Sequence, residues 1–197
     1  MEAVTELFIM TKGIKDVIQL CYVHVSQGSL AEMLNRQAFI KGANGRLLLS
    51  VLNRFTAVHE MLMTYGLEPE PLEDCHSALK DLEEIYKHIA YFAPTVNIQT
   101  GDVSRWQVSV SMGYVKLIQA PSPPALIILA YYAAAITTIR NRWYTHNWTE
   151  YVLRGISQVL DDSMQHWLEW PMQQVQDRMS ELGVQPFGPD QAVNDLS

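Results

Sequence analysis

The histidines and cysteines are the residues whose types could support chemistry, and their spacing matches no known site. The six histidines contain no HExxH pair, which would place two imidazoles on one helix face. The two cysteines are too few for a zinc site of three or four thiolates, or for a disulfide framework. We therefore expect no metal site and no cofactor, and interpret the histidines as ordinary surface or half-buried residues. These histidines are His24, His59, His76, His88, His146 and His166, and the cysteines are Cys21 and Cys75.

Two short segments invite comparison with catalytic motifs. Cys75 and His76 are sequence neighbours, and neighbours on a helix point about 100° apart, whereas a nucleophile and its base must face each other. The segment Asp161–Gln165 is similar to the magnesium-binding DDxxD motif of terpenoid synthases, but Gln165 replaces its third carboxylate. We interpret the two aspartates as a solvent-exposed helix end and expect that the chain is not an enzyme.

Composition is typical of an acidic globular domain. The chain has 197 residues and a net charge of −7. Hydrophobic residues make up 48% of it, a larger fraction than is typical of a disordered chain. This length fits one domain, which buries about 70% of the surface of its unfolded chain. The acidic balance argues against a nucleic-acid surface, which needs clustered Lys and Arg to neutralise phosphates.

The sequence contains neither a recognisable export signal nor a long apolar span. Its first six residues carry glutamate where a secretory signal peptide carries basic residues. The most apolar run, Ala125–Ile139, is about 15 residues long, short of the roughly 20 that cross a bilayer. We expect this run to be a buried core helix, and we expect no membrane span.

Helical periodicity dominates the chain, because apolar residues recur at steps of three and four. We predict an all-α fold, a single irregular bundle of about six to eight helices. The helix at 124–140 is apolar on nearly every side and is predicted to be the most buried. Gly13 is predicted to mark a close packing contact inside the first helix. The predicted helices are 4–25, a short one from 29, 46–65, 72–92, 103–120, 124–140, 148–164 and a last polar helix ending at 181.

Aromatic residues and methionines are unusually abundant for a domain of this size. The chain has five tryptophans and nine methionines, and the tryptophans all lie in its second half. Methionine adapts to irregular apolar shapes, so this composition suits a pocket for a small apolar molecule. It also suits a well-packed core, and composition alone leaves both interpretations open.

Three blocks of residues resemble one protein family in order and spacing. The first block reads "hydrophobic, basic, Gly, Ile/Val", the second "W … P-x-A-L-x-I-L-A-x-Y", and the third "W-x-x-x-x-W … I … L … WP". In this sequence the blocks are Leu7–Val17; Trp106 with Pro123–Ala133; and Arg142–Tyr144 with Trp148, Ile156, Leu160, Trp167 and Trp170-Pro171. These blocks resemble the C-terminal regulatory domain of fungal zinc-cluster transcription factors, including members like the sterol uptake control protein.

The resemblance covers about Val4 to Pro171 and implies an all-helical regulatory domain, which we expect over residues 1–183. Residues 184–197 contain two prolines and few apolar residues, so we expect them to be a flexible tail. Family members carry further helices upstream and a six-cysteine, two-zinc DNA-binding cluster. Residues 1–197 contain only two cysteines, so we expect no direct DNA binding and either a fragment or a short product. The resemblance further implies a location in the nucleus, the cytoplasm or both, and a homodimer or heterodimer as the possible assembly.

Sterol-sensing members of this family hold an apolar ligand, so the resemblance favours a pocket for a sterol or another apolar small molecule. We expect one wall on the first helix and the other on the tryptophan-rich half, with a tyrosine hydroxyl as the polar contact. The alternative is a helical protein–protein interaction module without a small ligand, in which these residues only fill the core. The candidate residues are Phe8, Met10, Ile14, Ile18, Trp106, Met112, Tyr131, Tyr132, Trp143 and Trp148.

Overall fold

The computed structural model describes residues 2–20, 47–92, 98, 100–139 and 143–181, and this part of the chain is all-α without a strand. The predicted fold class, a bundle of α-helices, is therefore confirmed. The expected short helix from residue 29 and the expected tail at 184–197 lie outside the described residues. The helices are α1 Glu2–Leu20, α4 Leu49–Thr64, α5 Pro69–Phe92, α6 Thr100–Ser109, α7 Met112–Gln119, α8 Pro123–Ile136, α9 Trp143–Val159, the 3-10 helix η1 Asp162–Leu168 and α10 Glu169–Glu181.

Helix α8 lies at the centre of the bundle. All its residues from Pro124 to Ile136 are buried, so it presents no polar stripe to solvent, as its sequence predicts. Pro123 and Pro124 occupy its first turn, where proline is tolerated because those amides have no intrahelical partner. Helices α4, α5, α6, α7, α9 and α10 all pack against α8.

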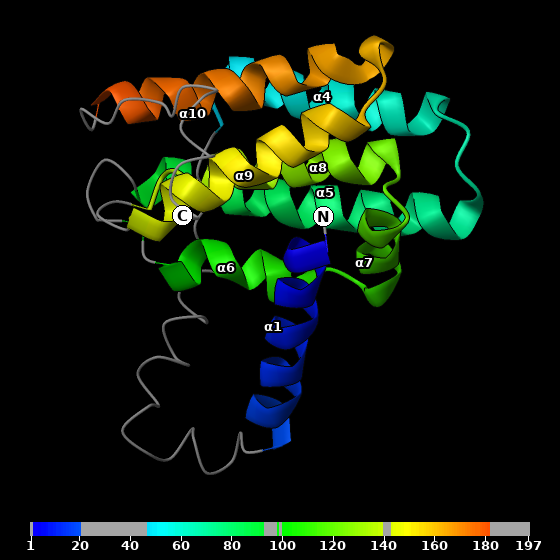
Figure 1. The fold of residues 1–197 in the computed structure, drawn as a ribbon, viewed down its shortest axis with the longest axis vertical. Coiled ribbons are helices and arrows are strands. Elements are labelled where there is room, and N and C mark those ends of the chain that lie inside the picture. The colour runs from blue at the N-terminus through cyan, green and yellow to red at the C-terminus, as the bar shows by residue number, and fades with distance from the viewer. Residues whose placement is uncertain (1, 21–46, 93–97, 99, 140–142, 182–197) are drawn as a thin grey trace, which may run out of the picture.

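Helix α1 is arranged differently from the rest of the bundle. Helices α4, α5, α8, α9 and α10 run broadly along one direction, whereas α1 crosses them, and its C-terminal half extends away from the body (Figure 1). Its N-terminal turns contact α6 and α7 and bury Val4 and Phe8. Helix α1 is therefore attached to the bundle through its first half.

The predicted helix 103–120 is wrong, because the chain breaks into α6 and α7 at residues 110–111. The Ser111 hydroxyl caps α7 by accepting from the Tyr114 amide at 2.9 Å, and it donates to the Asp74 carboxylate at 2.5 Å. At the end of α6, the Lys12 ammonium donates to the carbonyl oxygens of Val108 and Val110. A cation is favourable at a helix C-terminus, so side chains from α1 and α5 stabilise the break.

The predicted helix 148–164 is also wrong in its bounds. Helix α9 begins at Trp143 and ends at Val159, and the chain continues as η1. The Gln165 amide donates to the carbonyl oxygens of Ser157 and Leu160, both at 2.7 Å. These carbonyls have no helical partner once α9 ends, so Gln165 satisfies groups that otherwise need water.

No single helix in the described ranges is long and apolar enough to cross a membrane. Helices α7 and α8 reach the required length and composition only as a pair, and they bend by 104° where they join. The buried position of α8 matches the prediction that its apolar run is a core helix.

Substitution of Ala130 tests whether α8 is the centre of the domain. Ala130 has no exposed surface, so Ala130→Asp places an unpaired carboxylate in the interior and should destabilise the fold by several kcal/mol. Thermal unfolding followed by circular dichroism measures the effect. Ala90→Asp is the control, since Ala90 is exposed on α5 and should lose only about 0.7 kcal/mol through helix propensity. Equal melting temperatures for the two variants would contradict the central position of α8.

Two glycines in helices should respond oppositely to alanine. Gly13 is exposed, and an added Cβ meets no atom of the described residues within 4 Å, so the predicted close contact is not found there. Gly13→Ala should raise the free energy of unfolding by about 0.5–1 kcal/mol. At Gly113 the added Cβ lies far inside van der Waals contact with the Asp74 carboxylate, so Gly113→Ala should cost about 1–3 kcal/mol. Denaturant titration checks both values, and stabilisation of both variants would contradict the placement of Asp74.

Candidate functional site

Five aromatic side chains from five helices meet in the interior and form what we call the aromatic cluster. It consists of Phe8 (α1), Trp106 (α6), Tyr114 (α7), Tyr132 (α8) and Trp148 (α9). The rings of Trp106 and Tyr132 are stacked at its centre, with centroids 4.3 Å apart. Phe8 lies edge-on to both rings, at 5.9 Å from Trp106 and 6.5 Å from Tyr132. Tyr114 contacts Trp106 at 5.6 Å, and Trp148 contacts Tyr132 at 6.2 Å.

Hydrogen bonds to backbone carbonyls fix two members of the aromatic cluster. The Trp106 indole donates to the carbonyl oxygen of Ala78 on α5 at 2.8 Å. The Tyr114 hydroxyl donates to the carbonyl oxygen of Ala125 on α8 at 2.9 Å. Buried indole and phenol groups normally have such partners, because burial without one costs free energy.

The Tyr132 hydroxyl differs from its neighbours. It is buried and has no hydrogen-bond partner among the described residues. Burial alone raises the pKa of Tyr132 far above its ordinary value, so the group stays a neutral phenol. An unsatisfied buried hydroxyl costs about 1–3 kcal/mol, and a ligand that supplied the missing partner would recover part of that cost.

The structure brings together four of the ten predicted site residues, namely Phe8, Trp106, Tyr132 and Trp148. Met10 and Met112 are exposed, with 67% and 48% of their surface accessible, and lie outside the aromatic cluster. Tyr131 belongs to a different group of rings. The side chains of Ile14, Ile18 and Trp143 lie outside the described part of the structure.

A second group of rings, which we call the outer cluster, lies around Tyr131. It contains Phe55 (α4), Tyr86 (α5), Tyr131 (α8) and Trp170 (α10). Phe55 contacts Tyr86 at 5.1 Å and Tyr131 at 5.9 Å, and Tyr131 contacts Trp170 at 4.9 Å. The Tyr86 hydroxyl donates to the Tyr131 carbonyl oxygen at 2.8 Å, so this cluster has a satisfied polar group.

Sequence reasoning did not assign Tyr114, Phe55, Tyr86 or Trp170 to a site. Each lies on the buried face of a helix, and helical periodicity marks that face. Periodicity shows only that these residues are core-facing. It does not show which rings from different helices meet.

The polar groups considered for catalysis do not assemble into a reactive site in the described residues. Asp161 and Asp162 are exposed at the start of η1. Burial, followed by the charge of Asp74, raises the pKa of Cys75 to about 12, which leaves an unreactive thiol. Buried His88 lies 3.8 Å from Asp102, measured from Nε2 to Oδ1. Its other ring nitrogen, Nδ1, has no hydrogen-bond partner among the described residues, so no nucleophile lies beside it in that part of the structure.

One pair of histidines departs from the predicted scatter. Nδ1 of His59 on α4 lies 3.2 Å from Nδ1 of His76 on α5, which is hydrogen-bond distance. Within the described ranges, no group of three or more His, Cys, Asp and Glu side chains is placed to hold a metal ion. The pair is therefore a contact between two helices.

Comparison of the chain with family models, with curated proteins and with solved structures finds no match. The feature of the aromatic cluster that packing does not explain is the Tyr132 hydroxyl.

Removal of single hydroxyls tests this difference between the tyrosines. Tyr132→Phe should raise the free energy of unfolding by about 1 kcal/mol, because it deletes an unpaired buried group. Tyr114→Phe should lower it by about 1 kcal/mol, because it deletes the donor to Ala125. Each change should move the melting temperature by about 2–4 °C, measurable by calorimetry. A loss of stability in Tyr132→Phe like that in Tyr114→Phe would show that the Tyr132 hydroxyl has a partner.

Proposed function

We propose that this chain is a regulatory, ligand-sensing domain of the kind found in fungal zinc-cluster transcription factors. In this proposal the aromatic cluster receives a sterol or another apolar small molecule, and the chain neither binds DNA nor catalyses a reaction. Its place of action is the nucleus, the cytoplasm or both. The single observation that carries the proposal is the unpartnered hydroxyl of Tyr132 inside an apolar aromatic surrounding.

The chemistry of the aromatic cluster defines the ligand that suits it. The faces and edges of Phe8, Trp106 and Trp148 form an apolar surrounding and offer large flat contact areas. A phenol both donates and accepts a hydrogen bond, so Tyr132 suits a ligand with one hydroxyl or carbonyl group. A mostly apolar molecule with a single polar end, such as a sterol, satisfies both requirements.

Access to Tyr132 requires movement of α1 in this proposal. The rings of Phe8, Trp106 and Tyr132 contact one another, so a ligand that reaches the hydroxyl must separate them. Phe8 is the member on α1, which is attached to the bundle through its first half and through Lys12. Ligand binding would then shift the equilibrium between a docked and a displaced α1, which is a means of regulation.

A second candidate function is a protein–protein interaction module without a small ligand. Leu7, Ile9 and Met10 on α1 are 37%, 45% and 67% exposed, although α1 buries Val4 and Phe8 on another face. Exposed apolar side chains on a projecting helix favour contact with a partner, either a second copy or a related chain. In this case the aromatic cluster only stabilises the core.

Ligand binding is tested by thermal shift with ergosterol delivered from cyclodextrin. A ligand at 100 times its Kd stabilises the folded state by about 2.7 kcal/mol, which should raise the melting temperature by about 5–10 °C. Tyr132→Phe should lose most of this shift, whereas Tyr114→Phe should keep it. Organic extraction of the purified protein, followed by mass spectrometry, checks for a lipid bound during expression.

The same experiment separates the two candidates. A folded protein that shows neither a thermal shift nor an extracted lipid would overturn the ligand-sensing proposal. Sedimentation equilibrium of the wild type and of Met10→Asp would then test the interaction module. A shift of equal size in wild type and Tyr132→Phe would show that binding occurs without the Tyr132 hydroxyl.

A further inference from the structure

Helices α4 and α5 are joined by one direct hydrogen bond between imidazoles. Nδ1 of His59 and Nδ1 of His76 are 3.2 Å apart, and the ring centroids are separated by 5.2 Å with planes 21° apart. The ring nitrogens, not the ring faces, therefore make the closest approach. Both residues are half-buried, so water competes only in part for this bond.

The bond depends on the protonation states of both rings. It forms when one Nδ1 carries a proton and the other offers its lone pair. If both imidazoles are protonated, both nitrogens are donors, and two positive charges face each other in a partly desolvated site. The pair therefore supports the packing of α4 on α5 only while at least one ring is neutral.

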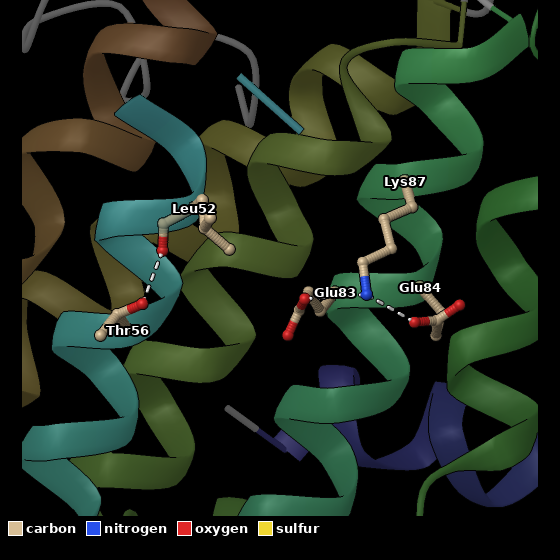
Figure 2. A network of polar contacts seen from close by, with 5 residues as sticks. All are labelled: Leu52, Thr56, Glu83, Glu84 and Lys87. Carbon is tan, nitrogen blue, oxygen red and sulfur yellow. Dashed lines mark hydrogen bonds and ion pairs between the residues drawn. The ribbon is translucent and has the colours of Figure 1, made fainter. Parts of the chain in front are cut away.

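The electrostatic surroundings favour the neutral state of His59. Burial is the largest effect that lowers the pKa of His59, and the charge of His76 lowers it further. Glu83 on α5 acts in the opposite direction, but its carboxylate is paired at 2.9 Å with Lys87, which also bonds Glu84 (Figure 2). Helix α8 also packs on α4, and the only titratable side chains of α8 are tyrosines.

We propose that His59 and His76 form a pH-sensitive link that holds α4 against α5 at neutral pH and releases it on acidification. Because the folded protein disfavours protonated His59, the stabilisation is fully present above the ordinary histidine pKa of 6.5 and is lost as the pH falls below it. The link is independent of any ligand in the aromatic cluster. It is a regulatory device between α4 and α5, and it involves none of the side chains of the aromatic cluster.

Loosening of α4 would reach the core through Phe55. Phe55 lies one helical turn before His59 and packs on Tyr86 and Tyr131 in the outer cluster. Trp170 contacts the same two tyrosines, at 5.9 Å and 4.9 Å. A shift in the position of α4 therefore alters the surroundings of Trp170, and tryptophan fluorescence can report that shift.

Hydrogen exchange of the full chain, read by mass spectrometry between about pH 7.5 and about pH 5, tests the link. We expect the protection factors of the α4 amides in the wild type to fall about fivefold at the lower pH, after correction for the intrinsic exchange rate. A fivefold change corresponds to the loss of about one hydrogen bond. In His59→Gln the loss should disappear, because a side-chain amide both donates and accepts at every pH. His76→Gln should behave alike, and exposed His166→Gln should keep the wild-type response.

Direct titration of the wild type by NMR requires no substitution. Coupling predicts two separate protonation steps for the pair, with the pKa of His59 below that of an ordinary histidine. Loss of α4 protection of the same size in His59→Gln as in wild type would overturn the proposal. Titration of His59 in a single step at the ordinary histidine pKa of 6.5 would overturn the proposal as well.

Discussion

Burial of α8 on every side constrains the rest of the domain. A helix without a polar stripe must be enclosed completely, and each enclosing helix must offer it an apolar face. The polar side chains that these helices bury beside α8 then need hydrogen-bond partners there. Tyr114, Tyr86 and Thr149 do so by donating to α8 carbonyl oxygens. The Tyr132 hydroxyl is the group on α8 itself that lacks such a partner in the described structure.

The same helix also separates the interior into two aromatic regions. Tyr131 and Tyr132 are consecutive residues, and consecutive side chains on a helix point about 100° apart. Tyr132 therefore enters the aromatic cluster with Trp106, whereas Tyr131 enters the outer cluster with Phe55 and Trp170. The proposed ligand contact involves Tyr132, whereas α4, which carries His59, reaches α8 through Phe55 and Tyr131, so the two proposals depend on different side chains of α8.

Sequence periodicity was sufficient to predict the all-α class and the central helix α8. It did not predict the break between α6 and α7 or which rings meet in the aromatic cluster. The break between α6 and α7 is stabilised by Lys12 and Asp74, which are distant in sequence and give no local signal there. Met10 was a poor choice for a wall that includes Phe8, because residues two apart on a helix point about 200° apart. The contact between His59 and His76 joins two helices, and single-sequence patterns do not show such contacts.

The attachment of α1 has a consequence for the order of folding. The bond from Lys12 to Val108 closes a loop of 96 residues, whereas the contact between Trp106 and Ala78 spans only 28. Long loops are entropically expensive to close before their contacts can compensate, so helices near in sequence assemble first. Helix α1 precedes α6 and α7 in the chain, but it can dock only after those two helices have formed. Because Phe8 contacts Tyr132 as well as Trp106, its site is complete only after the chain has been made through α8.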